Sequence, residues 1–294
     1  MTLYAPVYYQ EFACIANRCR HSCCIGWEID IDADTLAKYK SLKSGYGATI
    51  CDTIDWAETP HFRLAAGERC PHLDECGLCK IILGLGEDYL CDICREHPRF
   101  YNFTNVAEVG LGMSCPEAAR LILSSPDFAQ TEVVGEVADV TDDVPFDGCA
   151  ARAYFYTILE DGDYASALKR IYRTYSIDAG EDNRWLNILN SLEYLNAERK
   201  ELFLRYSSSR RPESGETDEY QKRFLAYLVY RHCTESIDIE EFCARLSFCL
   251  FCERLLASMI CARGANTLQE VAALASILSE EIEYSEENTW ALMG

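Results

Sequence analysis

Four cysteines stand within eleven residues near the N-terminus, in the stretch CIANRCRHSCC (14–24). The whole chain holds 17 cysteines, and eleven of them lie between Cys14 and Cys115. Disulfides, a metal or iron–sulfur site, or apolar filling of a core could each account for this concentration. The answer decides how the first third of the chain can fold.

The start of the chain argues against disulfides. No basic segment followed by an apolar one occurs in the first twenty residues, MTLYAPVYYQEFACIANRCR. This stretch is therefore not typical of a secretory signal, and we expect a cytoplasmic protein. Cytoplasmic thiols are kept reduced, and 17 is an odd number that excludes complete pairing. No apolar run reaches the roughly 18 residues that a membrane span needs, so we expect no membrane partner.

The charge of the chain is strongly acidic. Asp and Glu number 48 against 27 Lys and Arg, which gives a net charge of −21. Such a surface repels phosphate backbones, and no basic patch interleaved with aromatic residues occurs. We therefore expect no nucleic-acid partner.

The pattern of apolar residues predicts a mostly α fold, with an irregular Cys-rich metal-binding region followed by a helical bundle. We expect a Cys-rich domain over residues 1–125, a connector over 126–149 and an α-helical domain over 150–294. No alternation typical of strands is sustained, although residues 131–140 could form one. The expected helices of the last domain cover residues 150–175, 183–206, 218–234, 238–262 and 267–284.

Local signals place several helix starts. Asp32 is a good N-cap for a helix through Tyr39, and Pro116 suits the first position of another helix. A further short helix is expected over residues 81–90. Thr267 and Glu270 match a capping box, and Asp238 with Glu241 resembles one. Polar loops are expected over residues 141–148 and 207–217.

Two CxxC pairs follow the opening run, Cys76–Cys79 and Cys91–Cys94. A CxxC pair can present two thiolates to one metal ion, and two such pairs are typical of a zinc site. Together with the cysteines upstream there are more candidate ligands than one zinc ion can bind. An iron–sulfur cluster, two separate metal sites, or some cysteines that bind no metal therefore stay as alternatives. Cys115, just before Pro116, would lie at a helix N-terminus, where a thiolate is favoured.

The order FACIANRC, CCIGWEIDID, CPHLDECGLCKI, LGEDYL, HPR and SCPEAARLIL resembles the flagellin lysine-N-methylases, which share features with Cys-rich zinc- or iron-chelating domain proteins. The resemblance covers about residues 5–125, and Cys76 and Cys91 are additions to its pattern. The cysteines that it implies as metal ligands are Cys14, Cys19, Cys23, Cys24, Cys70, Cys79, Cys94 and Cys115.

This resemblance implies a protein-lysine N-methyltransferase. It would use S-adenosylmethionine and a cysteine-bound iron–sulfur cluster of the 4Fe-4S type, with zinc as the alternative metal. Its substrate would be flagellin or another protein with exposed lysines. The alternative hypothesis is a non-catalytic zinc- or iron-binding module whose helical domain binds a partner. Under neither hypothesis does the sequence identify a catalytic base.

Overall fold

The structure is a computed structural model of the chain and describes residues 1–19, 21–138, 145–178, 182–206, 215 and 217–293. The chain forms two compact units. We call Met1–Phe12 with Arg99–Gly294 the helical unit, and Ala13–Pro98 the cysteine-rich unit. The expected domain boundaries near residues 125 and 150 do not coincide with this division, because the first strand pairs far along the chain.

The helical unit begins with a strand that joins distant parts of the sequence. β1 (Thr2–Pro6) is parallel to β5 (Ala107–Leu111) and antiparallel to β6 (Thr131–Glu136). β4 (Arg99–Phe103) forms a hairpin with β5, so the four-stranded sheet has the order β4-β5-β1-β6. The strand expected within residues 131–140 is confirmed by β6, whereas the other three strands were not predicted.

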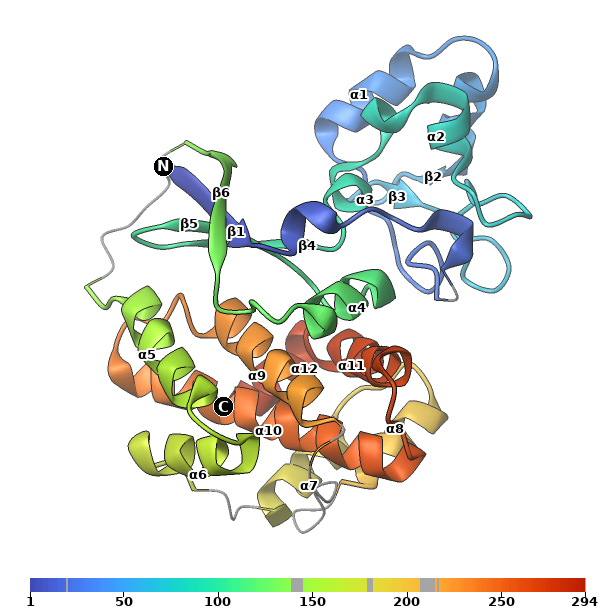
Figure 1. Cartoon of the computed structure of the whole chain (residues 1–294). Coiled ribbons are helices and arrows are strands. Elements are labelled where there is room, and N and C mark those ends of the chain that lie inside the picture. The colour runs from blue at the N-terminus through green and yellow to red at the C-terminus, as the bar shows by residue number, and fades with distance from the viewer. Residues whose placement is uncertain (20, 139–144, 179–181, 207–214, 216, 294) are drawn as a thin grey trace. The chain divides into compact units, whose positions relative to one another are not determined.

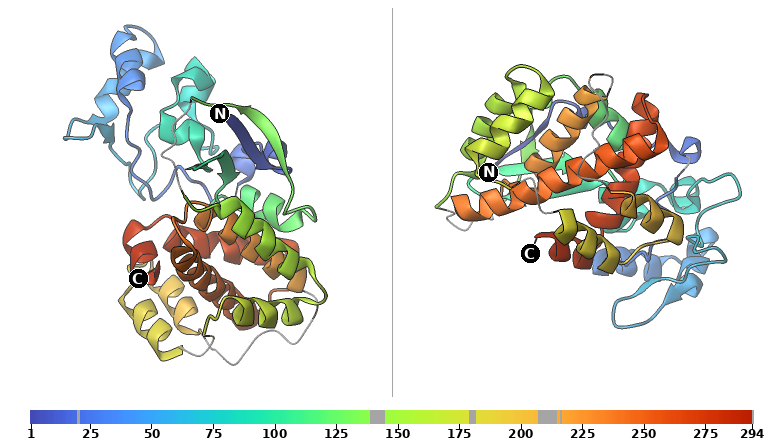
Figure 2. Two further views of the ribbon diagram at one scale, coloured as in Figure 1. Left: turned by 90° about the vertical axis from the view of Figure 1, so that its left-hand side faces the viewer. Right: turned by 90° about the horizontal axis from the view of Figure 1, so that it is seen from below.

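Helices pack against this sheet and make up most of the unit, as Figure 1 and the left view of Figure 2 show. The mostly helical fold expected from the sequence is confirmed. The helices are α4 (Pro116–Ser124), α5 (Gly148–Glu160), α6 (Tyr164–Thr174), α7 (Asp182–Ser191), α8 (Ala197–Leu204), α9 (Asp218–His232), α10 (Ile239–Arg263), α11 (Leu268–Ile282) and α12 (Glu286–Met293), with a short 3₁₀ turn, η1 (Tyr9–Glu11), after β1.

Two of the expected long helices are broken in the structure. The helix predicted over residues 150–175 is interrupted between α5 and α6, where Gly162 has a φ of +76° and Asp163 caps α6 by accepting from Ser166 N–H. The helix predicted over residues 183–206 is interrupted before Asn196, which caps α8. Both breaks follow from side chains that satisfy a new helix N-terminus.

The predicted helix starts are otherwise confirmed. Thr267 and Glu270 form a complete capping box at α11. Asp238 caps α10, but the Glu241 carboxylate accepts from Ile237 N–H rather than from the cap residue. The loop expected over residues 207–217 lies mainly outside the described residues, as does the first half of the one expected over residues 141–148.

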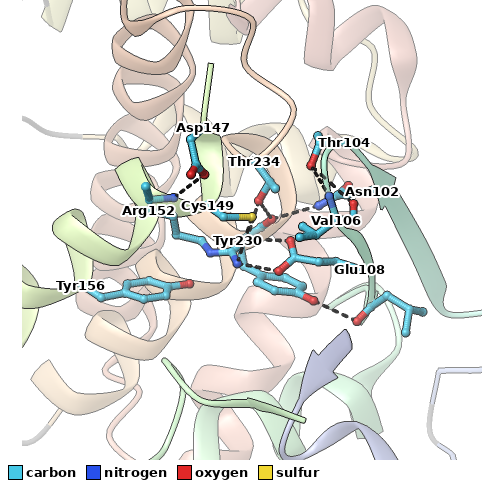
Figure 3. A network of polar contacts seen from close by, with 12 residues as sticks. Asn102, Thr104, Val106, Glu108, Asp147, Cys149, Arg152, Tyr156, Tyr230 and Thr234 are labelled. Atoms are coloured by element: carbon cyan, nitrogen blue, oxygen red, sulfur yellow. Dashed lines mark hydrogen bonds and ion pairs between the residues drawn. The ribbon is translucent and has the colours of Figure 1, made fainter. Parts of the chain in front are cut away.

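A buried ion pair connects the sheet to the helices (Figure 3). Arg152 of α5 donates to both carboxylate oxygens of Glu108 on β5, at 2.7 and 2.5 Å. It also donates to the Thr234 hydroxyl at 2.5 Å, and its guanidinium lies 4.7 Å from the centre of the Tyr230 ring. Each charge is therefore matched by close partners in a site with little solvent.

The cysteine-rich unit consists of short elements. They are η2 (Ala16–Arg18), α1 (Ala33–Ser41), η3 (Tyr46–Thr53), β2 (Ile54–Asp55), β3 (His61–Phe62), α2 (Lys80–Leu85), η4 (Glu87–Tyr89) and α3 (Asp92–Glu96). Asp32 caps α1 as predicted, and the helix expected over residues 81–90 is reduced to α2 and η4. In the described part of the chain no helix combines the length and the apolar composition needed to cross a bilayer.

Candidate functional site

The cysteine-rich unit has an apolar core that contains thiols. Cys70 and Cys91 are buried, with 7% and 1% of their surface exposed. Cys24, Cys51, Cys79 and Cys94 are partly buried and pack against the same core. The rest of this core is aliphatic and aromatic: Ile29, Ile31, Tyr39, Ile50, Ile54, Phe62 and Ile81.

Backbone hydrogen bonds bring the first three thiols together. Cys70 N–H donates to the Cys24 carbonyl at 2.8 Å. The chain then turns back on itself, so that Leu73 pairs with Cys79 and Lys80 N–H donates to the His72 carbonyl at 2.7 Å. Cys70 and Cys79 therefore lie on one tight hairpin, with Cys24 beside it.

The other two thiols come from the start of α3. Cys91 is the residue before that helix, and Cys94 N–H donates to the Cys91 carbonyl at 3.0 Å. Tyr39 of α1 fixes this segment, because its hydroxyl donates to the Tyr89 carbonyl at 2.6 Å and lies 3.6 Å from Cys91 Sγ. We call Cys24, Cys70, Cys79, Cys91 and Cys94 the thiol cluster.

The thiols of this cluster influence one another's ionisation. Burial raises the pKa of Cys70 to about 12, and the nearby Cys24, Cys79 and Cys91 thiols add to the rise. Burial likewise raises the pKa of Cys79. Backbone N–H groups act in the opposite direction, since those of Ile81 and Ile82 donate to the Cys79 sulfur. A bound cation would favour the thiolates over these neutral thiols.

Two pairs of thiols share hydrogen bonds. Interaction with Cys94 lowers the pKa of Cys91, while the same contact raises the pKa of Cys94. Interaction with Cys23 lowers the pKa of Cys24 to about 6, against the opposing effect of burial. In each pair one sulfur is thus favoured as the thiolate, the form that binds metals.

His72 lies in the same core but is not a ligand candidate. Its Nδ1 lies 2.5 Å from the Tyr46 hydroxyl and its Nε2 lies 3.1 Å from the Thr53 hydroxyl. Burial lowers the pKa of His72 to about 4, with a further contribution from Lys80. Both ring nitrogens therefore serve to hold η3 against the hairpin.

The donor chemistry of the cluster suits a soft metal centre. Thiolates are preferred ligands of zinc and of iron–sulfur clusters. Among the described residues, no three Cys, His, Asp or Glu side chains are already arranged to hold a metal ion. The five thiols thus supply the right atoms in one region without converging on one point. Within the cluster only Cys91 and Cys94 are hydrogen-bonded to each other, whereas Cys24 is bonded to Cys23 outside it.

Comparison with known proteins identifies relatives. The chain is 32% identical over 137 residues to a lysine-N-methylase of Salmonella typhimurium and to one of Salmonella choleraesuis, which covers 43% of this chain and 34% of each relative. It is 33% identical over 137 residues to the flagellar biosynthetic protein FliU of Salmonella muenchen, and this match covers 80% of that protein.

The chain belongs to the lysine-N-methylase family. As a member of that family, it spans only about a third of the length of the two lysine-N-methylases it matches. No protein-family model and no solved structure matches the chain.

The structure brings together four of the eight cysteines that the family pattern implies: Cys24, Cys70, Cys79 and Cys94. Cys14 and Cys23 are exposed in the same unit, and the Cys19 thiol donates to the His21 carbonyl at 2.9 Å. The metal-binding role of all eight stays a prediction.

Cys115 belongs to the helical unit. It directly precedes α4, as the sequence predicted, and Ala119 N–H donates to its carbonyl at 2.9 Å. The residue packs against the core of that unit. Its helix position is therefore confirmed, and its role as a ligand stays a prediction.

The family pattern passes over one member of the thiol cluster, Cys91. The CxxC spacing of Cys91 and Cys94 was the signal that could have found it. The other CxxC pair behaves differently, because Cys76 is exposed while Cys79 is in the cluster. Spacing alone does not separate a buried pair from a pair with one exposed member.

Proposed function

We propose that this chain acts as a protein-lysine N-methyltransferase, using S-adenosylmethionine and a cysteine-bound iron–sulfur cluster. The observation that carries the proposal is the 33% identity to FliU over 80% of that protein, together with the matches to two proteins named lysine-N-methylase. The proposed substrate is flagellin or another protein with exposed lysines. The proposed compartment is the cytoplasm, where the thiols would stay reduced.

The thiol cluster supports the metal part of this proposal. Its sulfurs would hold an iron–sulfur cluster, and the backbone N–H groups that donate to Cys70 and Cys79 would stabilise the bound thiolates. When bound, the metal centre supplies positive charge that keeps these thiols ionised. It would also tie the hairpin to α3, since their thiols would share one centre.

Methyl transfer places clear demands on the substrate. The lysine Nζ lone pair attacks the methyl carbon of the sulfonium, a C–N bond forms, and the C–S bond breaks to release a neutral thioether. The ammonium must first lose its proton, because its ordinary pKa is about 10.4. The net charge of −21 would attract lysine-rich proteins and the cationic donor before either binds.

The test is a methylation assay on the full chain. The protein is purified without oxygen, incubated with flagellin and S-adenosylmethionine, and flagellin is analysed by peptide mass spectrometry for methylated lysines. Omission of the donor is the first control, and a matched non-flagellar protein with exposed lysines is the second. Absence of methylation on both proteins, with a chain that carries its metal, would refute the activity.

The thiol cluster by itself fits a second candidate function. This candidate is a non-catalytic metal-binding module with a helical unit that binds a partner. Calorimetric titration with S-adenosylmethionine separates the two, since only the enzyme should bind the donor. Iron, acid-labile sulfide and zinc are measured on the same sample to identify the metal.

A further inference from the structure

Two cysteines of the helical unit lie in contact with each other, outside the thiol cluster. Cys233 is the C-cap residue of α9, and Cys249 lies within α10. Their sulfurs are 3.8 Å apart, and both residues are completely buried. Burial alone is common for cysteine, which often packs as a small apolar residue. The position of the pair therefore has to decide whether it has a further role.

The pair joins two helices at a point where one of them ends. α9 and α10 pack against each other, and Arg245 of α10 donates to the His232 carbonyl at 2.9 Å. Cys233 is followed by a short connection, residues 234–238, in which Ile237 is 61% exposed. Helix ends and connections open locally at a lower cost in free energy than helix interiors. Local opening there gives a small molecule a route to Cys233 that does not require the whole unit to unfold.

Contact between two thiols favours a disulfide once one of them is oxidised. The sulfurs of a disulfide are about 2.05 Å apart, so Cys233 and Cys249 need to approach by roughly 1.8 Å, which side-chain rotation can supply. Burial raises the pKa of Cys249, so its reactive thiolate is scarce in the closed structure. The first oxidation step therefore calls for a small neutral oxidant and for local opening.

We propose that Cys233 and Cys249 form a redox-sensitive clamp, which hydrogen peroxide closes by joining α9 to α10 through a disulfide. The peroxide oxidises one thiol to a sulfenic acid and releases water. The second thiol then attacks this sulfur, the S–S bond forms, and the oxygen leaves as a second water. Two thiols thus lose two hydrogen atoms, and the peroxide is reduced to two water molecules. The inference depends neither on methyl transfer nor on a metal.

The closed clamp would stabilise the helical unit by restricting its unfolded chain. The disulfide closes a loop of roughly 15 residues, from Cys233 to Cys249. In a unit of about 200 residues, a loop of this length should raise the melting temperature by about 6–12 °C. In the proposed cytoplasmic compartment the thiols stay reduced, so the clamp would close only under oxidising conditions.

Disulfide mapping of the full chain after exposure to hydrogen peroxide tests the clamp. Free thiols are blocked with N-ethylmaleimide while the chain is unfolded, and the chain is then cleaved with trypsin. Trypsin places the two cysteines on separate peptides, residues 232–245 and 246–254. Each peptide holds one further cysteine, so fragmentation of the joined peptides by mass spectrometry locates the bond. We expect it to join Cys233 to Cys249.

Cys249→Ala should lose both the cross-link and the rise in melting temperature, whereas Cys252→Ala, one turn further along α10, should keep both. Dithiothreitol should reverse the rise in the wild type. Mapping of the wild type decides the matter even where a variant does not fold. A bond through Cys243 or Cys252 instead overturns the proposal. So does absence of the bond at a peroxide dose that oxidises the exposed Cys261, or a bond to Cys233 that leaves the melting temperature unchanged.

Discussion

Glu108 and Arg152 are opposite charges enclosed between the sheet and α5, and the substitution Glu108→Gln would leave the guanidinium without its counter-charge. The two side chains are only 4% and 8% exposed. Glutamine keeps one oxygen that can accept from Arg152, but its amide N–H groups then face the other N–H group of the guanidinium. Removal of one partner from a buried ion pair costs about 3–5 kcal/mol. We expect the lower end, about 3 kcal/mol, because the Thr234 hydroxyl still accepts from Arg152.

Urea unfolding followed by far-UV circular dichroism measures this cost, since most helices belong to the helical unit. Glu201→Gln is the matched control, because it breaks an ion pair with Arg205 in which the side chains are 70% and 56% exposed. That loss should be below about 1 kcal/mol. The double variant Glu108→Gln/Arg152→Met should recover part of the stability, because it removes the unpaired charge.

The result that would refute this reasoning is a Glu108→Gln variant no less stable than the surface control. Such an outcome would mean that water reaches Arg152 or that the pair contributes little in the folded state. A double variant less stable than Glu108→Gln alone would point to lost packing of the Arg152 chain against Tyr230.

Three further outcomes are expected. Burial alone would raise the pKa of Glu283, but the neighbouring Arg231 and His232 outweigh burial and lower this pKa from 4.5 to about 2. The stability that these partners contribute is therefore present above pH 4.5 and is lost as the pH falls toward 2. Acid titration should show a smaller loss of stability in Glu283→Gln than in the wild type. Thr267→Ala should destabilise α11 by about 1 kcal/mol in urea unfolding, with exposed Thr49→Ala as the control. Chelation of bound metal should lower the melting temperature of the wild type, whereas melting unchanged by chelator would count against a structural metal.

Local signals in the sequence were sufficient to predict where several helices begin. Asp32, Pro116 and the Thr267–Glu270 box each start a helix where the residue type predicts one, because capping depends on neighbours within one turn. The break before Asp163 was also encoded locally, by a glycine followed by a good cap. It was missed because apolar residues continue with helical spacing on both sides.

Long-range pairing could not be predicted in this way. Leu3 pairs with Ala107, and β5 is a short run buried on both faces, which cannot be distinguished from a buried helix by periodicity. The membership of the thiol cluster was equally hidden. Cys91 and Cys76 occupy the same position in two CxxC pairs, and only the packing of α1 against the segment before α3 buries one of them.

The pairing of β1 with β5 makes the cysteine-rich unit an insertion within the chain of the helical unit. The Arg99 side chain donates to the Tyr9 hydroxyl at 2.9 Å, so the sequence leaves the helical unit and returns to it at neighbouring points. During synthesis, the first strand must wait for its partner until residues 13–98 have emerged. A long unfolded loop opposes this closure through its entropy. Any ligand that folds the insertion first would shorten that loop and so promote assembly of the sheet without touching it.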